Sequence, residues 1–258
     1  MPELSEVETF KKYFDKTSLG NTVKDVRIRD ERILKVPKEE FVKALKNKKF
    51  KETIRHGKYL LICVENQFLI MHFGMTGDLD YFDNIKDEPK YGKVLFEFTN
   101  GSFLSYISQR LFGYLDLTNS LEDFLAQKKL GPDAYKMSYE DFKSTLVRRT
   151  AIMKSALLNQ SIFAGIGNIY SDEILFQTKL NPKRKINTLE ESELKELFEN
   201  IKKVLKYGID FEGQLEDYSK DLLIPHRSKD KNCPQCSSKL VRYEISGRHG
   251  FFCPKCQK

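Results

Sequence analysis

Two groups of residues, at opposite ends of the chain, have types and spacing that can do chemistry. Pro2 follows Met1 and precedes Glu3. If Met1 is removed, Pro2 carries a free secondary amine, and terminal amines titrate at about 7.7–8.0, so a useful fraction is unprotonated at neutral pH. Such an amine can attack an electrophilic carbon and form a Schiff base. Proline also suits the first turn of a helix, which leaves a purely structural role open.

The second group is a set of four cysteines near the C-terminus. Cys233 and Cys236 form one Cys-x-x-Cys pair, and Cys253 and Cys256 form another after the sixteen residues 237–252. Two such pairs can place four thiolates around one zinc ion. Disulfides and redox pairs are the alternatives, but no secretory signal is visible and we expect a reducing compartment. We therefore predict one structural Zn²⁺ per chain.

The composition is that of an ordinary globular protein with a modest basic excess. The chain has 258 residues, of which 40% are apolar and 12% aromatic. No apolar run approaches the roughly 20 residues of a membrane span, so we expect no membrane partner. Lys and Arg number 44 against 37 Asp and Glu, giving a net charge of +7. Basic clusters at 46–51, 148–149 and 183–185 are compatible with a long positively charged groove that binds an anionic partner.

The elements that must position these residues change character along the chain. Leu4, Val7, Phe10 and Phe14 share one face of a predicted helix over residues 3–15. Short runs rich in β-branched and aromatic residues follow, punctuated by Gly, Asn and Asp, as in an antiparallel sandwich or barrel. These runs cover 23–28, 59–65, 68–73, 94–98, 103–107 and 114–117, with a helix near 39–45.

From about residue 120 the pattern becomes helical and then ends in a metal-binding tail. The predicted helices cover 139–146, 153–158, 170–177 and 190–205, and the tail contains a β-hairpin with strands at 239–244 and 248–252. We therefore predict an α+β chain with three domains, at residues 1–119, 120–228 and 229–258.

Three internal segments combine glycine with residues that can bind a ligand. Lys58 follows a glycine before an apolar strand, although a surface lysine at a strand edge is the simpler interpretation. Met75 lies in a glycine-rich turn that could lift its side chain clear of a sheet, whereas Met is normally core filler. Gly165 and Gly167 precede a predicted helix, whose free N–H groups would favour a phosphate. A helix corner without a ligand is the alternative.

Together with both chain ends, these segments resemble the formamidopyrimidine-DNA glycosylase and endonuclease VIII family of base-excision repair enzymes. The resemblance covers nearly the whole chain, with the motifs in the family's order. It implies an N-terminal β-sandwich with a terminal-proline helix, a helical domain with a helix-two-turn-helix motif, and a zinc β-ribbon finger. It also implies a monomer that acts on double-stranded DNA containing a damaged base or an abasic site.

The resemblance implies a chemical role for five residues. Pro2 is the nucleophile, Glu3 moves protons, and Glu6 orients the site from one turn along the helix. Lys58 binds a phosphate beside the lesion, and Lys154 lies near the catalytic centre. The implied reaction is base removal through a Schiff base, followed by β- and δ-elimination.

A second set of residues is implied to hold the DNA. Met75 enters the gap that a flipped nucleotide leaves, with Arg110 and Phe112 from a later loop. Asn168, Arg248 and Tyr170 belong to the implied DNA contacts, the first two at phosphates. His72 is either a phosphate contact or a packed strand histidine. The segment before Arg110 lacks the family's usual Asp-Pro, which leaves the opposite-base preference open.

The segment between Tyr218 and Cys233 is shorter than in bacterial formamidopyrimidine glycosylases. In those enzymes a longer, Gly-containing loop caps flipped 8-oxoguanine. We therefore expect 8-oxoguanine to be a poor substrate, with formamidopyrimidines, hydantoins or oxidised pyrimidines preferred.

Two other classes of function remain as alternatives. A catalytically silent DNA-binding zinc protein on the same scaffold would have no need of Pro2 and Glu3. A zinc-ribbon scaffold for protein assembly would show no salt-dependent DNA affinity. For the enzyme we expect a cytoplasmic, nucleoid-associated location.

Overall fold

The computed structural model describes residues 2–258, so the predicted removal of Met1 lies outside the described residues. By its contacts the chain divides into two compact units. The first unit contains Pro2 and residues 6–128, and the second contains residues 3–5 and 129–258. Helix α1 (Leu4–Thr17) therefore has its first two residues in the second unit and the others in the first.

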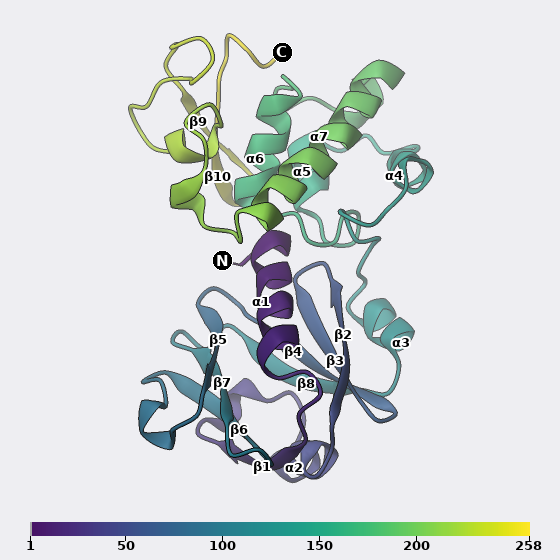
Figure 1. The fold of residues 1–258 in the computed structure, drawn as a ribbon. Helices are drawn as coiled ribbons and strands as arrows, with labels where there is room; N and C mark the ends of the chain where they lie inside the picture. The colour runs from purple at the N-terminus through teal and green to yellow at the C-terminus, as the bar shows by residue number, and fades with distance from the viewer. Residues whose placement is uncertain (1) are drawn as a thin grey trace. The chain divides into compact units, whose positions relative to one another are not determined.

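The first unit is a β-sandwich of two four-stranded antiparallel sheets (Figure 1). One sheet has the order β1-β6-β7-β5 and the other β2-β3-β4-β8. The strands are β1 (Val23–Ile28), β2 (Phe50–His56), β3 (Tyr59–Val64), β4 (Gln67–His72), β5 (Gly77–Phe82), β6 (Gly92–Phe98), β7 (Phe103–Ser108) and β8 (Tyr114–Thr118). Helices α2 (Lys38–Leu45) and α3 (Leu121–Gln127) complete this unit.

Alternate strand residues fill the space between the two sheets. Leu60, Ile62 and Val64 of β3 belong to one buried cluster with Phe96 and Phe98 of β6. Because successive side chains of a strand point to opposite faces, this spacing buries one face of each sheet. The ring of Phe50 on β2 lies 6.0 Å from that of Phe96, which joins the sheets directly.

The second unit consists of helices and one hairpin. Its longer elements are α4 (Tyr139–Leu146), α5 (Met153–Leu158), α6 (Asn168–Gln177), α7 (Glu191–Asp210), β9 (Val241–Ile245) and β10 (Arg248–Phe252). Helix α6 contacts α5, α7 and β10. Seven of its residues, Tyr170 to Phe176, are buried, and Ser171, Asp172 and Glu173 are among them. Polar side chains in so buried a helix need hydrogen-bonding or charged partners.

The predicted fold class, α+β with a sandwich, a helical part and a cysteine-bearing hairpin, is confirmed. Two strands were missed, β2 and β5. The sequence of β2 is FKETIRH and that of β5 is GDLDYF, so charged residues dilute the apolar alternation that marks a strand. Among the described residues, no helix combines the length and apolar character that crossing a bilayer would require.

Candidate functional site

The start of helix α6 holds the carboxylate of Glu3. One Glu3 oxygen accepts from the backbone N–H of Ile169 at 2.9 Å, and the other from that of Tyr170 at 3.4 Å. The Glu3 side chain is only 2% exposed. First-turn N–H groups have no partner inside a helix, and they favour an anion. Glu3 therefore lies in a fixed orientation, one peptide bond away from Pro2.

The Gly-x-Gly segment before α6 fits this contact. A Cβ on Gly167 would lie 2.2 Å from the carboxylate carbon of Glu3, so only glycine allows the approach. The carbonyl of Gly165 accepts from the N–H of Leu4 at 3.1 Å. We expected free N–H groups for a phosphate at this helix start. For Ile169 and Tyr170 that expectation is wrong, because Glu3 occupies both.

A buried charge cluster lies along α6. Lys154 of α5 is fully buried and pairs with Asp172, and it also donates to Ser171 Oγ at 2.7 Å and to the Asn168 carbonyl at 3.1 Å. Arg227 donates to the other Asp172 oxygen from Nε at 2.9 Å, and the Tyr243 hydroxyl donates to the first at 2.5 Å. Burial lowers the pKa of Lys154, and the charge of Asp172 opposes that shift. Lys154 thus lies inside the unit, in a paired position.

Asn168 and the hairpin are joined directly. The Asn168 side-chain amide donates to the His249 carbonyl at 2.7 Å, and the N–H of Phe251 donates to Asp172 at 3.2 Å. Arg248, next to His249, is exposed at the start of β10. The structure therefore brings together Asn168 and Arg248, two residues predicted to bind phosphate, at one end of α6.

Tyr170 has a different environment from the other predicted DNA contacts. Its ring is fully buried, and its hydroxyl shares a hydrogen bond of 2.7 Å with that of Tyr218. Its backbone N–H faces Glu3. Tyr170 thus has a structural position: it is buried beneath the start of α6 and contacts Glu3 and Tyr218.

In the first unit, Lys58 lies in the turn between β2 and β3, and His72 ends the neighbouring strand β4. Tyr59 pairs with His72 in the sheet, and the His72 ring lies 5.0 Å from the rings of both Tyr59 and Tyr114. Burial lowers the pKa of His72 to about 4, and the charges of Lys58 and Lys128 add to that shift. His72 is therefore neutral at physiological pH in the DNA-free protein.

The predicted wedge residues come together on two touching loops of the first unit. The N–H of Arg110 donates to Thr76 Oγ1 at 3.2 Å, and a Cβ on Gly74 would lie 2.3 Å from the backbone N of Gly113. The Arg110 guanidinium lies 5.1 Å from the centre of the Phe112 ring. Met75 is 41% and Phe112 is 56% exposed. Large apolar side chains exposed on a fixed backbone are available to a partner.

Pro2 and Glu6 lie close to Glu3 in the sequence, on either side of it. Both are partly exposed, and Glu6 lies in the first turn of α1. Pro2, the fixed Glu3 carboxylate and a second carboxylate thus lie within five consecutive residues.

The four cysteines of the tail form a compact cluster. Their sulfur atoms all lie within 4.8 Å of one another, with 3.9 Å between Cys233 and Cys256 and 3.5 Å between Cys236 and Cys253. Bonds of about 2.3 Å to a tetrahedral zinc place sulfurs roughly 3.8 Å apart. The donor set and its dimensions therefore fit one metal ion.

Sequence reasoning missed four residues of this site: Asp172, Glu173, Arg227 and Tyr243. The available signal was the pair Asp172-Glu173 inside the otherwise apolar stretch of α6. Two adjacent acids in a buried helix indicate specific partners, because an unpaired buried carboxylate is very costly. Nothing in the sequence pointed to Arg227 or Tyr243 as those partners.

Comparison with known proteins places the chain in a family. Models described as the formamidopyrimidine-DNA glycosylase N-terminal domain and H2TH domain match residues 1–115 and 130–219. A zinc finger found in FPG and IleRS matches residues 230–258. A formamidopyrimidine-DNA glycosylase of Streptococcus pyogenes is 33% identical over 100% of this chain and 99% of the relative. The chain belongs to the formamidopyrimidine-DNA glycosylase family.

Solved structures of this glycosylase family agree over the full length. The Lactococcus lactis protein in complex with THF-DNA and an inhibitor has a TM-score of 0.88 at 28% identity, covering 100% of both chains. A MutM complex with DNA containing carbocyclic 8-oxo-G has a TM-score of 0.87 at 27% identity, again covering 100% of both chains. A formamidopyrimidine-DNA glycosylase of Ligilactobacillus salivarius is 34% identical, covering 100% of this chain and 99% of that relative.

Proposed function

We propose that this protein removes oxidised bases from double-stranded DNA and then cleaves the strand at the resulting abasic site. The observation that carries the proposal is the Glu3 carboxylate, fixed on the start of α6 next to Pro2, in a chain that matches glycosylases from end to end. A catalytically silent DNA-binding protein is not favoured, because the relatives that match this chain over its full length are named as enzymes.

The first step is displacement of the damaged base. Once Met1 is removed, the Pro2 nitrogen attacks C1′ of the deoxyribose, and the glycosidic bond breaks with its electron pair leaving on the base. Glu3 handles protons during this exchange, delivering one to the ring oxygen as the sugar opens, and Glu6 orients the site. The result is a Schiff base between Pro2 and the opened sugar.

The second step is strand cleavage. The Schiff base acidifies the neighbouring sugar protons, so loss of a proton from C2′ expels the 3′ phosphate by β-elimination. A further proton loss expels the 5′ phosphate by δ-elimination, and hydrolysis then frees Pro2. The product is a gap of one nucleotide.

The remaining site residues hold the substrate. Lys58, Asn168 and Arg248 bind phosphates near the lesion, which fixes the backbone without reading sequence. Met75 and Phe112 fill the gap left by the flipped nucleotide, while Arg110 contacts the orphaned base. His72, neutral at physiological pH in the free protein, packs in strand β4 beside the residue that follows Lys58. Lys154 and Tyr170 are buried and support the site from within the fold.

We assign one Zn²⁺ ion to Cys233, Cys236, Cys253 and Cys256. The compact cluster of sulfurs supports the assignment. Four thiolates leave no open position for a catalytic water, so the ion has a structural role and stabilises the hairpin that carries Arg248.

The substrate preference follows from the short segment before the cysteines. By the family resemblance, residues 219–232 stand in the place of a longer capping loop, and we infer weak excision of 8-oxoguanine relative to formamidopyrimidines, hydantoins or oxidised pyrimidines. We also propose three domains: a catalytic β-sandwich domain at residues 1–119, a helix-two-turn-helix DNA-binding domain at 120–228 and a four-cysteine zinc-finger hairpin at 229–258. As a bacterial-type repair enzyme, the protein would work at the nucleoid in the cytoplasm.

A panel of duplexes, each with one lesion, tests the proposal. Protein shown by mass spectrometry to lack Met1 is expected to cut formamidopyrimidine and abasic duplexes and leave undamaged DNA intact. Equal cleavage of 8-oxoguanine and formamidopyrimidine would contradict the inferred preference, and no cleavage of any duplex would contradict the function.

A further inference from the structure

One edge of strand β10 is held by helix α6. The backbone carbonyl of His249 accepts from the Asn168 side-chain amide at 2.7 Å, and the N–H of Phe251 donates to the Asp172 carboxylate at 3.2 Å. The backbone groups of alternate strand residues, such as His249 and Phe251, lie on the same edge of the strand. Strands β9 and β10 form a sheet of two strands, so the edge of β10 that faces away from β9 needs partners from elsewhere. Helix α6 supplies them.

The spacing of the two α6 residues fits this edge. Asn168 and Asp172 are four residues apart, so their side chains lie one above the other on the same face of the helix. Four helix residues advance the chain by about 6 Å, and two strand residues advance it by about 6.7 Å. The two contacts therefore form side by side without bending the helix or the strand.

Gly250 lies between the two contacts and permits the close approach. It is buried, and a Cβ at this position would lie 2.7 Å from a carboxylate oxygen of Asp172 and 2.5 Å from Cζ of Tyr243. Gly250 pairs with Tyr243 across the hairpin, and the Tyr243 hydroxyl donates to Asp172. Any side chain at residue 250 would therefore push β10 away from α6.

The Asp172 carboxylate is the point where these contacts meet. Tyr243 on β9 donates to one oxygen, and Phe251 on β10 donates to the other. Lys154 pairs with the first oxygen and Arg227 with the second. The Asp172 side chain is fully buried, where a carboxylate needs such donors. One side chain thus fixes both strands of the hairpin on α6.

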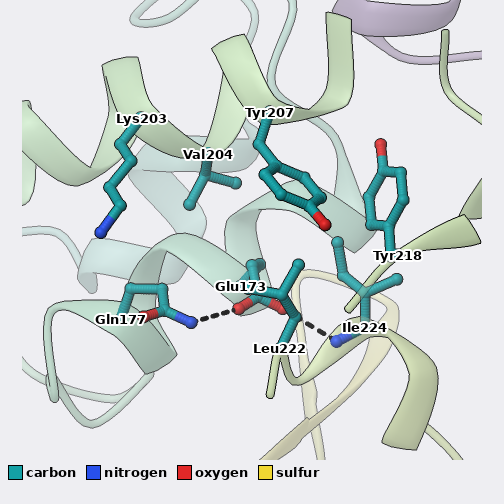
Figure 2. A pocket seen from close by; sticks show the side chains of 8 residues that line it. All are labelled: Glu173, Gln177, Lys203, Val204, Tyr207, Tyr218, Leu222 and Ile224. Carbon is teal, nitrogen blue, oxygen red and sulfur yellow. Dashed lines mark hydrogen bonds between the residues drawn. The ribbon is translucent and has the colours of Figure 1, made fainter. Parts of the chain in front are cut away.

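The adjacent carboxylate, Glu173, serves a different part of the second unit. Figure 2 shows it beside a cavity of about 150 Å³, which is lined by residues of α7 and of the segment 218–224. Its oxygens accept from Gln177 Nε2 at 2.7 Å and from the backbone N–H of Ile224 at 2.8 Å. Successive helix residues point in directions about 100° apart. Asp172 therefore faces the hairpin, whereas Glu173 faces the cavity.

We propose that Asp172 is a positioning residue for DNA binding: through β10 it holds Arg248 in a fixed place beside Asn168. Arg248 is exposed and directly precedes His249 in the strand. A side-chain amide has two N–H donors, so the contact of Asn168 with the His249 carbonyl leaves the second for a phosphate. The two phosphate ligands then act as one clamp that is formed before DNA binds. The inference rests on the proposed function, which gives Asn168 and Arg248 their phosphates.

DNA affinity as a function of salt tests the inference in the zinc-loaded protein. The probe is a duplex with one tetrahydrofuran residue, an abasic analogue that lacks the C1′ hydroxyl and so forms no Schiff base. Asp172→Asn keeps the shape of the side chain but has one acceptor oxygen in place of two. We expect about tenfold weaker binding and a slope of log affinity against log salt that is smaller by about 1, as for the loss of one cationic phosphate contact. Arg248→Ala should show the same two changes.

The double variant separates positioning from a general loss of structure. If Asp172 acts through Arg248, adding Asp172→Asn to Arg248→Ala should weaken binding less than twofold further. A further tenfold loss in the double variant would show that Asp172 supports the fold alone, and it would overturn the proposal.

Two substitutions serve as matched controls. Glu173→Gln makes the same change from acid to amide at the neighbouring buried position, so it should lower the unfolding free energy and leave the salt slope unchanged. Asp230→Asn removes an exposed carboxylate of the tail, which pairs with Lys239. It should leave affinity within twofold of wild type and the slope unchanged. A slope that falls by about 1 in either control would contradict a specific role for Asp172.

Gly250→Ala gives a second route to the same test if Asp172→Asn does not fold. It keeps every charge and displaces β10 from α6, so the same loss of affinity and slope is expected. Wild-type affinity and slope in folded Asp172→Asn or Gly250→Ala would contradict the positioning role. Failure of the proposed function would be seen in the wild type instead, as equal affinity for the analogue duplex and for undamaged duplex.

Discussion

The wedge loops of the first unit and the start of α6 in the second both carry predicted site residues, but they are built in opposite ways. The wedge loops expose apolar side chains, Met75 and Phe112, on a backbone fixed by the contact between Gly74 and Gly113. The first half of α6 and the adjacent helix α5 bury charged side chains: Asp172 and Glu173 of α6 and Lys154 of α5 are each within 1% of complete burial.

Residues that only bind DNA are therefore separate from residues that also stabilise the fold. An exposed side chain on a fixed loop contributes little to folding, so its replacement should change binding alone. A buried ion pair is sensitive to the loss of either partner, so replacement there should lower stability as well.

Removal of the metal should have the largest effect. The hairpin that carries Arg248 has a small core of its own, and structural zinc supplies folding free energy on the order of 10 kcal/mol. Chelation, or Cys253→Ser, is expected to unfold the hairpin and weaken binding to abasic duplex more than a hundredfold. Zinc content measured beside DNA affinity checks this, and full affinity in zinc-free protein would contradict it.

Loss of the Asp172 carboxylate should come next. Asp172→Ala leaves Lys154 and Arg227 without their counterion, and breaking a buried pair costs roughly 3–5 kcal/mol. Urea denaturation measures the loss. The matched control is Asp210→Ala, which removes the exposed pair with Lys206 and should cost at most about 1 kcal/mol. Equal losses of unfolding free energy in the two variants would show that burial of the Asp172 ion pairs does not increase their contribution to stability.

The low pKa of His72 predicts that the unfolding free energy of the first unit decreases in acid. Its folded pKa of about 4 lies below the ordinary value of 6.5, so folding favours the neutral ring. The contribution is complete above pH 6.5 and is lost as the pH falls toward 4, by up to about 3 kcal/mol. Denaturation of wild type and His72→Phe across this range is expected to show a shallower slope in the variant. Identical slopes would exclude His72 as the cause.

The wedge residues should give the smallest change in stability. Phe112→Ala and Met75→Ala are expected to weaken binding to lesion duplex by about 1–2 kcal/mol each, because an apolar wedge no longer fills the vacated stack. Their unfolding free energies should stay within about 0.5 kcal/mol of wild type. Val147→Ala, which truncates an exposed apolar residue of the second unit, is the control variant. A loss of stability as large as the loss of affinity would break the contrast with α6.

The sequence was sufficient where spacing alone sets the geometry. The four cysteines cluster as their spacing predicts, and the helix pattern from Leu4 to Phe14 predicts most of α1. It was insufficient where a contact joins distant segments. Glu3 and Ile169 are far apart in the chain, and their hydrogen bond depends on the fold of a whole unit. Local motifs thus pointed to α6 as a phosphate site, whereas two of its first N–H groups hold a carboxylate.

The most direct test of the account is chemical capture of Pro2. Protein without Met1 is incubated with abasic duplex and sodium borohydride, and the cross-linked peptide is sequenced by mass spectrometry. The account predicts one covalent adduct per chain, on the nitrogen of Pro2, formed slowly or not at all in Glu3→Gln. An adduct on Lys58, Lys154 or any other lysine, or no adduct with protein that binds the same duplex, would contradict the central role of Pro2.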